Sequence, residues 1–358
     1  MPFFKDKTIL VTGCCGTIGS TLVNTLLESH SPKQLIGIDN NESALFFKEQ
    51  ECLQHINAHF FLCDIQNSER IHDVMKGVDI VFHTAAFKHV ILCERSPSEA
   101  IRNNVLGVQN IIEAAQRANV KKVVFTSSDK AVNPTNVMGT SKLMGERLFT
   151  AANSCRKGNA PLFASTRFGN VLGSQGSVIP IFREQIRKGG PVTLTDENMT
   201  RFIMTIKQAV DLVILSGTIA KGGEVFVTKM PTLRIKDLAQ VMIEQLAPHY
   251  GHKPKDIPIE LIGAKAGEKL YEELVTDEET RRTIELNDYF VVLPAFKGIY
   301  ESIEYNYSDI VNQKLDKTYT SDNSDLMSKE EIHQFLIEQD LLLPPESTHP
   351  DSRYWPGD

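Results

Sequence analysis

A glycine-rich turn near the start of the chain has the spacing that holds the phosphates of a dinucleotide. An apolar run ends at Thr12, and the string TGCCGTIG then leads into an amphipathic stretch. Gly13 permits a tight turn, Gly16 lets the backbone approach a pyrophosphate, and Gly19 lets a helix pack on the strand. A strand, a glycine turn and a helix in this order predict a dinucleotide-binding loop.

The cofactor predicted for this loop is NAD. The backbone N–H groups where the helix begins, at Thr17 and Ile18, would face the phosphates, which a helix N-terminus attracts. Asp39 ends the next apolar run, and its carboxylate suits the hydroxyl groups of an adenosine ribose. With the adjacent Asn40 it forms the expected ribose end of the site. No arginine flanks Asp39 to bind a 2′-phosphate, which favours NAD over NADP.

A second stretch, residues 126–142, combines several side chains that are suited to chemistry. An apolar run ends at Ser127-Ser128, so the residues after it lie at the carboxyl edge of a sheet, where ligands bind. Asp129-Lys130 comes next, although such a pair in a turn is usually a solvated surface pair. Met138 and Lys142 are four residues apart and therefore share one face of the next helix.

The elements that position these residues alternate between strands and helices. The apolar runs, which predict buried strands, are Thr8–Thr12, Gln34–Asp39, His59–Cys63, Ile80–Thr84, Lys122–Ser127 and Leu162–Phe168. The amphipathic stretches, which predict helices, include Ile18–Leu27, Glu69–Met75, Ala100–Ala118 and Val137–Ala152. This alternation predicts the α/β class, with a doubly wound parallel (Rossmann) sheet.

The pattern loosens after Asn170, which predicts a smaller α/β substrate-binding domain. Its expected elements are Val178–Lys188, Val192–Thr195, Ile206–Ile219, Glu224–Thr228, Ile235–Leu246 and Ile257–Ile262. We therefore predict an NAD-binding domain over residues 1–170, a mainly substrate-binding domain over 171–316, and a C-terminal arm over 317–358. Pro344-Pro345 and Trp355-Pro356 mark that arm, which we expect to wrap the body or a neighbouring subunit.

Composition excludes several classes of protein. The net charge of −7 over 358 residues opposes a nucleic-acid partner, because such domains are usually strongly basic. No apolar run reaches the roughly 18–20 residues of a membrane helix, and the N-terminus has no signal-peptide core. The six cysteines form no CxxC pair, so we expect reduced thiols, no metal site and a cytoplasmic protein.

The spacing of the glycines resembles that of the extended short-chain dehydrogenase/reductase family. Further matches come in order along the chain: Asp64-Ile65 at the adenine corner, Ala85-Ala86 in an H-x-A-A stretch along the cofactor, and Asn104 in a helix. The resemblance runs from Thr8 to about Leu274. It implies that these residues, with Ser127 and Lys142, line the cofactor, and that Lys88 reaches the sugar or the pyrophosphate.

Met138 stands where that family normally has the tyrosine of Tyr-x-x-x-Lys, and a thioether cannot transfer a proton. Met-x-x-x-Lys is typical of the UDP-N-acetylglucosamine 4,6-dehydratases of surface-sugar synthesis. Several strings resemble that subgroup: AAFKHV at residues 85–90, SDKAV at 128–132, RFGNVLG at 167–173, SVIPIF at 177–182, and GEKLYE at 267–272. The chain looks like a short member without a membrane-spanning half.

The resemblance implies oxidation at sugar C4, loss of water across C5 and C6, and hydride return to C6. Asp129 is then the acid for the departing hydroxyl and Lys130 the C5 base. A base lysine must be neutral, so we expect burial or the nearby Lys142 to depress the pKa of Lys130. Ser128 would hold O4 and Met138 would pack beside the nicotinamide. Either Asp129 or Lys142, the latter through water, would take the O4 proton.

We expect the substrate, UDP-N-acetylglucosamine, to be held mostly by the second domain. The residues predicted for its diphosphate, sugar and nucleotide are Lys88, Asn170, Ser177, Val178, Thr193, Arg201 and Lys265. The family more often has arginine at the Lys265 position, and lysine lacks the bidentate fork of arginine. His83 and His89 are expected to pack in the core or the cleft.

Other interpretations stay open on the sequence alone. A nucleotide-sugar epimerase of the same fold would return hydride to C4, a GDP-sugar dehydratase would use a similar diphosphate grip, and a non-catalytic NAD sensor would bind cofactor alone. Retention at C5 is favoured, because Met-type relatives mostly retain it. The family also implies a homo-oligomer.

Overall fold

The computed structural model describes residues 3–174, 176–265, 267–296, 299–300 and 302–342. Its main sheet has ten strands: β1 Thr8–Thr12, β2 Gln34–Asp39, β3 Ala58–Leu62, β4 Ile80–His83, β5 Lys122–Ser128, β6 Leu162–Phe168, β10 Val225–Thr228, β14 Thr283–Leu286, β15 Tyr289–Val292 and β16 Ile310–Asn312. Their spatial order is β16-β14-β15-β10-β6-β5-β4-β1-β2-β3. The seven strands from β10 to β3 are parallel, so the predicted Rossmann class is confirmed.

The central strands from β10 to β2 are buried because helices cover both faces, whereas the edge strand β3, expected to be buried, is largely exposed. These helices are α1 Thr17–Thr25, α2 Glu42–Glu51, α3 Ser68–Val74, α4 Val90–Arg95, α5 Pro97–Ile101, α6 Gly107–Arg117, α7 Val137–Ser154 and α9 Ile206–Ile219. Apolar residues of α1 and α9 join one core cluster, and those of α3, α6 and α7 join another on the opposite face. A π-helical turn over Arg102–Leu106 interrupts the single helix predicted for Ala100–Ala118.

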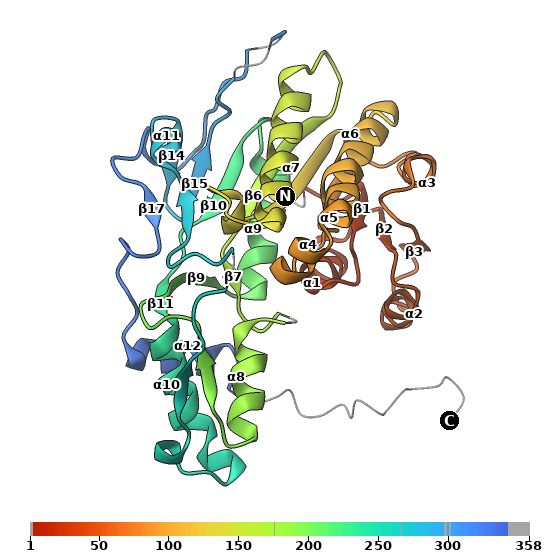
Figure 1. Cartoon of the computed structure of the whole chain (residues 1–358). Coiled ribbons are helices and arrows are strands. Elements are labelled where there is room, and N and C mark those ends of the chain that lie inside the picture. The colour runs from red at the N-terminus through yellow and green to blue at the C-terminus, as the bar shows by residue number, and fades with distance from the viewer. Residues whose placement is uncertain (1–2, 175, 266, 297–298, 301, 343–358) are drawn as a thin grey trace, which may run out of the picture.

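A second unit lies below the main sheet in the view of Figure 1, built around a separate apolar core. Its elements are β7 Asn170–Val171, α8 Val178–Arg187, β8 Val192–Leu194, β9 Thr200–Met204, β11 Thr232–Arg234, α10 Ile235–Leu246, β12 Ile259–Leu261 and α12 Lys329–Glu338. They form a small sheet of order β11-β9-β7 and a pair of β12 with β8. Two further short strands, β13 Glu273–Val275 and β17 Tyr319–Thr320, pair with each other, and α11 Asp277–Thr280 comes after β13.

The two units are interleaved along the chain, so a single cut near residue 170 does not separate them. After β9 the chain returns through α9 to β10, which pairs with β6 in the main sheet. It leaves again for α10 and comes back for β14, β15 and β16. The return is explained by the apolar composition of α9, which packs against β5 and β6.

The described part of the predicted C-terminal arm packs on its own chain. Ile332 and Leu336 of α12 are buried in the second core together with residues of α8 and α10. The Pro344-Pro345 and Trp355-Pro356 signals lie outside the described residues. Among the helices that the structure describes, none has the length and apolar character required to cross a membrane.

Candidate active site

The glycine loop has the shape predicted for a dinucleotide site. Gly13 has a φ of +68°, and a Cβ there would lie 2.7 Å from Cα of Ala85. A Cβ on Gly19 would lie 2.1 Å from the carbonyl oxygen of Gly13, so α1 packs against the turn only because Gly19 has no side chain. Helix α1 begins at Thr17, directly after Gly16, and presents its first N–H groups at this turn.

The carboxyl ends of β2 and β3 form the expected ribose and adenine corner. Asp39 accepts hydrogen bonds from the backbone N–H groups of Cys15 (3.0 Å) and Asn41 (3.0 Å), which fixes its carboxylate beside the glycine loop. Asn40 donates to Asp64 across the corner at 3.3 Å. In the described part of the chain, Cys14, Cys15 and Asp39 are the one set of potential metal ligands whose ligand atoms lie close enough together to hold a metal ion.

The segment after β4 lines the opposite side of the glycine loop. The Ala85 N–H donates to Thr12 Oγ1 at 3.3 Å. Asn104 accepts from the N–H of Phe87 at 2.8 Å and donates to its carbonyl at 2.9 Å and to Ser141 Oγ at 2.9 Å. Asn104 thus ties the segment of the H-x-A-A motif to α7, which carries Met138 and Lys142.

Asp129 and Lys130 lie in a short 3-10 turn directly after β5, at the carboxyl edge of the sheet. Oδ1 of Asp129 accepts from Ser128 Oγ (2.7 Å), from the Lys130 N–H (2.8 Å) and from Lys130 Nζ (3.0 Å). Its Oδ2 is buried and has no hydrogen-bond partner among the described residues. Lys130 Nζ also donates to Asn170 Oδ1 at 3.3 Å, which brings this predicted substrate residue to the pair.

The prediction that the pKa of Lys130 is lowered is wrong. Burial lowers the pKa of Lys130, but the negative charges of Asp129 and Glu272 raise it by more, so its pKa lies above the usual lysine value. Lys142 does not reverse this balance. The resting site therefore holds a protonated lysine between carboxylates rather than the neutral amine that we predicted.

Met138 and Lys142 are both buried on the inner face of α7. Lys142 Nζ donates to the carbonyl of Thr126 at 2.8 Å and lies 4.8 Å from the centre of the Phe125 ring. Burial lowers the pKa of Lys142 to about 8. Of the two candidate lysines, it is Lys142 that is poised to lose its proton near neutral pH.

Glu272 is a member of the site to which the sequence analysis gave no role, although it ends the GEKLYE string. Its Oε1 lies 3.7 Å from Lys130 Nζ and 3.7 Å from Arg201 Nε. The side chain is buried, and Oε2 has no hydrogen-bond partner among the described residues. Burial raises the pKa of Glu272 above the usual glutamate value. The sequence did contain a signal for this role, because Glu272 is an acidic residue within a string that resembles the dehydratase subgroup.

The predicted substrate residues do not all gather at Lys130. Arg201 is buried, and its guanidinium donates to the carbonyl oxygens of Thr200 (2.7 Å) and Lys269 (2.9 Å). Thr193 is bonded to Gln185 within the second unit, at 2.8 Å between the side chains. Ser177 is the N-cap residue of α8 and Val178 is its first residue. Lys265 is exposed in a loop, and burial lowers the pKa of Lys88. Their contacts with substrate stay predictions.

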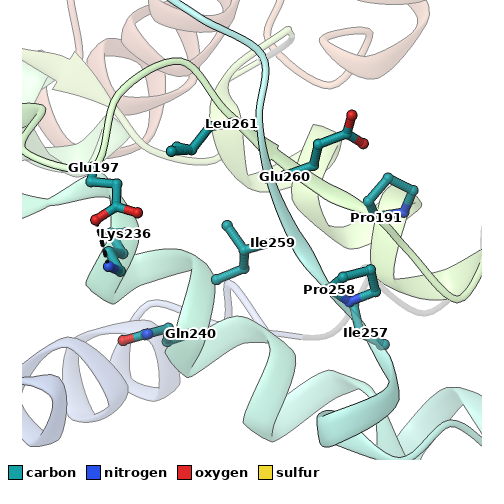
Figure 2. Close-up of a pocket in the computed structure, with 9 residues that line it drawn as sticks. All are labelled: Pro191, Glu197, Lys236, Gln240, Ile257, Pro258, Ile259, Glu260 and Leu261. Carbon is teal, nitrogen blue, oxygen red and sulfur yellow. Dashed lines mark hydrogen bonds and ion pairs between the residues drawn. The ribbon is translucent and has the colours of Figure 1, made fainter.

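Two histidines and a pocket lie outside this chemistry. His83 is fully buried, bonds to Thr12 Oγ1 at 2.7 Å, and burial lowers its pKa to about 3, so it is a neutral core residue. The side chain of His89 lies against Gly176. Figure 2 shows a pocket beside β12 that contains a Glu197–Lys236 ion pair of 2.9 Å and none of the predicted site residues.

A second buried ion cluster joins β6 and α7 to α11. Arg167 of β6 donates from Nε and Nη2 to both oxygens of Glu146 on α7, at 3.0 and 2.8 Å. It also donates to both oxygens of Glu279 on α11, each at 2.8 Å, and to the carbonyl of Leu274 at 2.8 Å. Because Leu274 is two residues after Glu272, this cluster anchors the segment that carries Glu272.

The chain is similar to proteins of known and unknown activity. A Methanocaldococcus jannaschii protein named an uncharacterised membrane protein is 49% identical over 95% of this chain and 98% of its own. A Campylobacter jejuni UDP-N-acetylglucosamine 4,6-dehydratase (inverting) is 36% identical over 91% of this chain and 96% of its own. A Rickettsia typhi UDP-glucose 4-epimerase is 36% identical over 95% and 98%.

Solved structures and a family model complete the comparison. Pen from Bacillus thuringiensis is 42% identical, with a TM-score of 0.88 over 95% of this chain and all of that chain. More distant structures of this fold include dehydratases and epimerases of nucleotide sugars, some with NAD bound. The family described as "Polysaccharide biosynthesis protein" matches residues 9–294. The chain therefore belongs to that family, within the extended short-chain dehydrogenase/reductases.

Proposed function

We propose that this protein is an NAD-dependent 4,6-dehydratase that acts on UDP-N-acetylglucosamine. The observation that carries the proposal is the Asp129–Lys130 pair at the carboxyl end of β5, on the same edge of the sheet as the glycine loop. An epimerase returns hydride to C4 and has no use for an acid at O6, whereas loss of water needs an acid and a base together. The Campylobacter relative supports this substrate by its name.

NAD is the cofactor that the site fits. Gly13 and Gly19 leave room that a Cβ would fill, α1 points its first N–H groups at the loop, and Asp39 is held at the ribose corner. Bound NAD supplies a hydride acceptor at C4 of the sugar and a hydride donor at C6. The side chains of the protein transfer the protons and exclude water from the site.

The Asp129–Lys130 contact supplies the two protonation states that the elimination needs. Transfer of one proton from Lys130 Nζ to Asp129 Oδ1, across 3.0 Å, gives a neutral amine and a carboxylic acid. The amine then takes the C5 proton, the C5–H electron pair forms the C5–C6 double bond, and the C6–O bond breaks. Asp129 gives its proton to the departing hydroxyl, so water leaves and the ion pair is restored.

The proton of the C4 hydroxyl needs a different acceptor, since Met138 cannot take it. We assign this role to Lys142, because its pKa of about 8 is the closest of the site lysines to neutral pH. Lys142 is buried next to Met138 on the same face of α7, where the thioether keeps the pocket apolar. Retention at C5, which Met138 favours, remains our expectation, although the Campylobacter relative is named an inverting enzyme.

Incubation with UDP-N-acetylglucosamine and subsequent proton NMR test the proposal. The expected product has a new C6 methyl signal, and its C5 coupling pattern reports retention or inversion. No net oxidation occurs, so turnover should continue without consumption of NAD. A complete absence of methyl signal with UDP-linked and GDP-linked N-acetylhexosamines would overturn the dehydratase assignment.

A UDP-sugar 4-epimerase is the second candidate, because the Rickettsia relative with that name is as similar as the dehydratase. The same spectra separate the two. An epimerase yields a C4 epimer that keeps its C6 hydroxymethyl group, whereas a dehydratase yields the methyl group. The Asp129–Lys130 pair favours the dehydratase.

A further inference from the structure

Glu272 is placed against the reactive lysine by contacts of its segment with two other parts of the chain. Lys269 Nζ donates to the carbonyl of Val132 at 2.6 Å, which holds residues 267–272 against the loop after Lys130. The Glu272 N–H donates to Ser321 Oγ at 3.0 Å, and the Ser321 N–H donates to the Glu272 carbonyl at 2.9 Å. The backbone of Glu272 is therefore fixed, and its carboxyl is directed at Lys130 and Arg201.

The carboxyl of Glu272 does not have the contacts of a purely structural ion pair. The cationic atoms that pair with it, on Lys130 and Arg201, both lie 3.7 Å from Oε1, beyond ordinary hydrogen-bond distance. Oε2 is buried without a partner among the described residues, which is costly for a group that serves only the fold. Arg201 meanwhile directs its Nη atoms at backbone carbonyls. The carboxyl thus faces Lys130, and its oxygens can still accept hydrogen bonds.

We propose that Glu272 is the third member of the Asp129–Lys130 unit, a positioning carboxyl that makes Lys130 a stronger base. This inference rests on the proposed dehydratase function. When Lys130 takes the C5 proton it becomes an ammonium ion, and a carboxylate 3.7 Å away stabilises that charge. Asp129 cannot do this alone throughout the reaction, because it carries a proton while it serves as the acid.

Some of the charged groups around Glu272 lower its pKa, and others raise it. Lys130, Arg201 and Lys269 favour its carboxylate form, whereas Asp129 and burial favour its protonated form. Burial is the largest effect, and it raises the pKa of Glu272, so this side chain takes up a proton at higher pH than an ordinary glutamate does. The support that it gives to Lys130 is therefore lost as the pH falls toward the acidic range.

Glu272→Gln, which keeps the shape of the side chain, tests the proposal. In protein labelled with ¹³C at lysine Cε, the Lys130 titration midpoint, assigned with Lys130→Arg, should fall by about one pH unit or more. Glu268→Gln, an exposed glutamate of the same segment, is the matched control and should leave the midpoint unchanged. Glu272→Asp should restore part of the shift. An unchanged midpoint in a folded Glu272→Gln protein would overturn the proposal.

Kinetics give a second, independent readout. In Glu272→Gln, the pH at which kcat reaches half of its maximum should fall by about one unit with little change in KM, because the neutral amine of Lys130 forms at lower pH. A merely structural defect would lower kcat at every pH and leave that midpoint in place. An unmoved midpoint would contradict the proposed role. If the wild-type protein turns over no sugar, the proposed function fails, while the Lys130 midpoint still tests the contact.

Discussion

Two clusters in the described structure each place one cation between two buried carboxylates. Arg167 lies between Glu146 and Glu279, and Lys130 lies between Asp129 and Glu272. Both clusters join a strand end of the main sheet to the segment over residues 272–279. They differ in how completely their polar atoms are bonded.

The Arg167 cluster is saturated, whereas the Lys130 cluster is not. The planar fork of Arg167 gives an N–H to each of the four carboxylate oxygens, at 2.8 to 3.0 Å. The single ammonium of Lys130 leaves Asp129 Oδ2 and Glu272 Oε2 buried and without partners in the described structure. A fully bonded network makes a core rigid, and the two unpaired oxygens of the Lys130 cluster are consistent with the proposed substrate site.

The largest effect expected is on turnover at the unsaturated cluster. Lys130→Ala should lower dehydratase turnover by about 10⁴-fold, since it removes the C5 base. NAD affinity, measured by calorimetry, should stay within about threefold, because Lys130 lies outside the glycine loop. Lys255→Ala, at an exposed lysine, is the control. Turnover near the wild-type rate would remove Lys130 from the mechanism.

The saturated cluster should instead respond in stability. Arg167→Met leaves two buried glutamates without a counter-charge and should lower the free energy of unfolding by about 3–5 kcal/mol. Arg187→Met removes an exposed arginine paired with Glu184 and should leave the free energy of unfolding nearly unchanged. Urea denaturation of both variants measures the difference. Equal losses would show that the Arg167 cluster is not the structural anchor.

The buried Lys142 near the Lys130 cluster should make the stability of the protein depend on pH. Its pKa of about 8 lies below the usual 10.5, so the folded state binds this proton less tightly than the unfolded chain does. Stability should therefore rise as the pH increases from about 8 to 10.5, by roughly 3 kcal/mol at most. Burial also lowers the pKa of Lys122 to about 8, so Lys142→Met should remove only the part of that rise that Lys142 causes. The exposed Lys221→Met should keep the whole rise. Identical pH slopes in denaturation would contradict the shift.

The smallest effect is expected at the cofactor corner. Asp39→Asn weakens the anionic partner of the ribose hydroxyls and should raise the Kd for NAD about tenfold, as measured by calorimetry. The melting temperature should change little, because the amide oxygen can still accept from one of the two N–H groups, of Cys15 or Asn41, that the carboxylate holds. Glu42→Gln, exposed at the start of α2, should leave the Kd unaltered. An unaffected Kd in Asp39→Asn would remove Asp39 from the cofactor site.

Much of this arrangement can be predicted from local sequence patterns. The six N-terminal strands were predictable to within one residue at each end, because apolar runs between glycine and polar turns define buried parallel strands. The same runs place Asp129 and Lys130 at the carboxyl edge. The glycine spacing determines the cofactor loop, since only a residue without Cβ fits at Gly13 and Gly19.

The rest depends on contacts between distant segments. Glu272 is 142 residues from Lys130 and meets it only because the segment that leads into β13 packs against the turn after β5. Asp129 and Glu272 together raise the pKa of Lys130, and the direction predicted from sequence was wrong because it weighed burial and Lys142 but neither carboxylate. Ser321 and α12 likewise reveal that the described C-terminal segment packs on its own chain.

The most direct measurement is the isotopic content of the product formed from UDP-N-acetylglucosamine in deuterated water. Our account predicts a 4-keto sugar with a C6 methyl group and one deuterium at C5, because Lys130 exchanges its protons with solvent before it reprotonates C5. Lys130→Ala should give neither the methyl group nor the label. A C4 epimer with an unlabelled C5 from the wild-type protein would contradict the account.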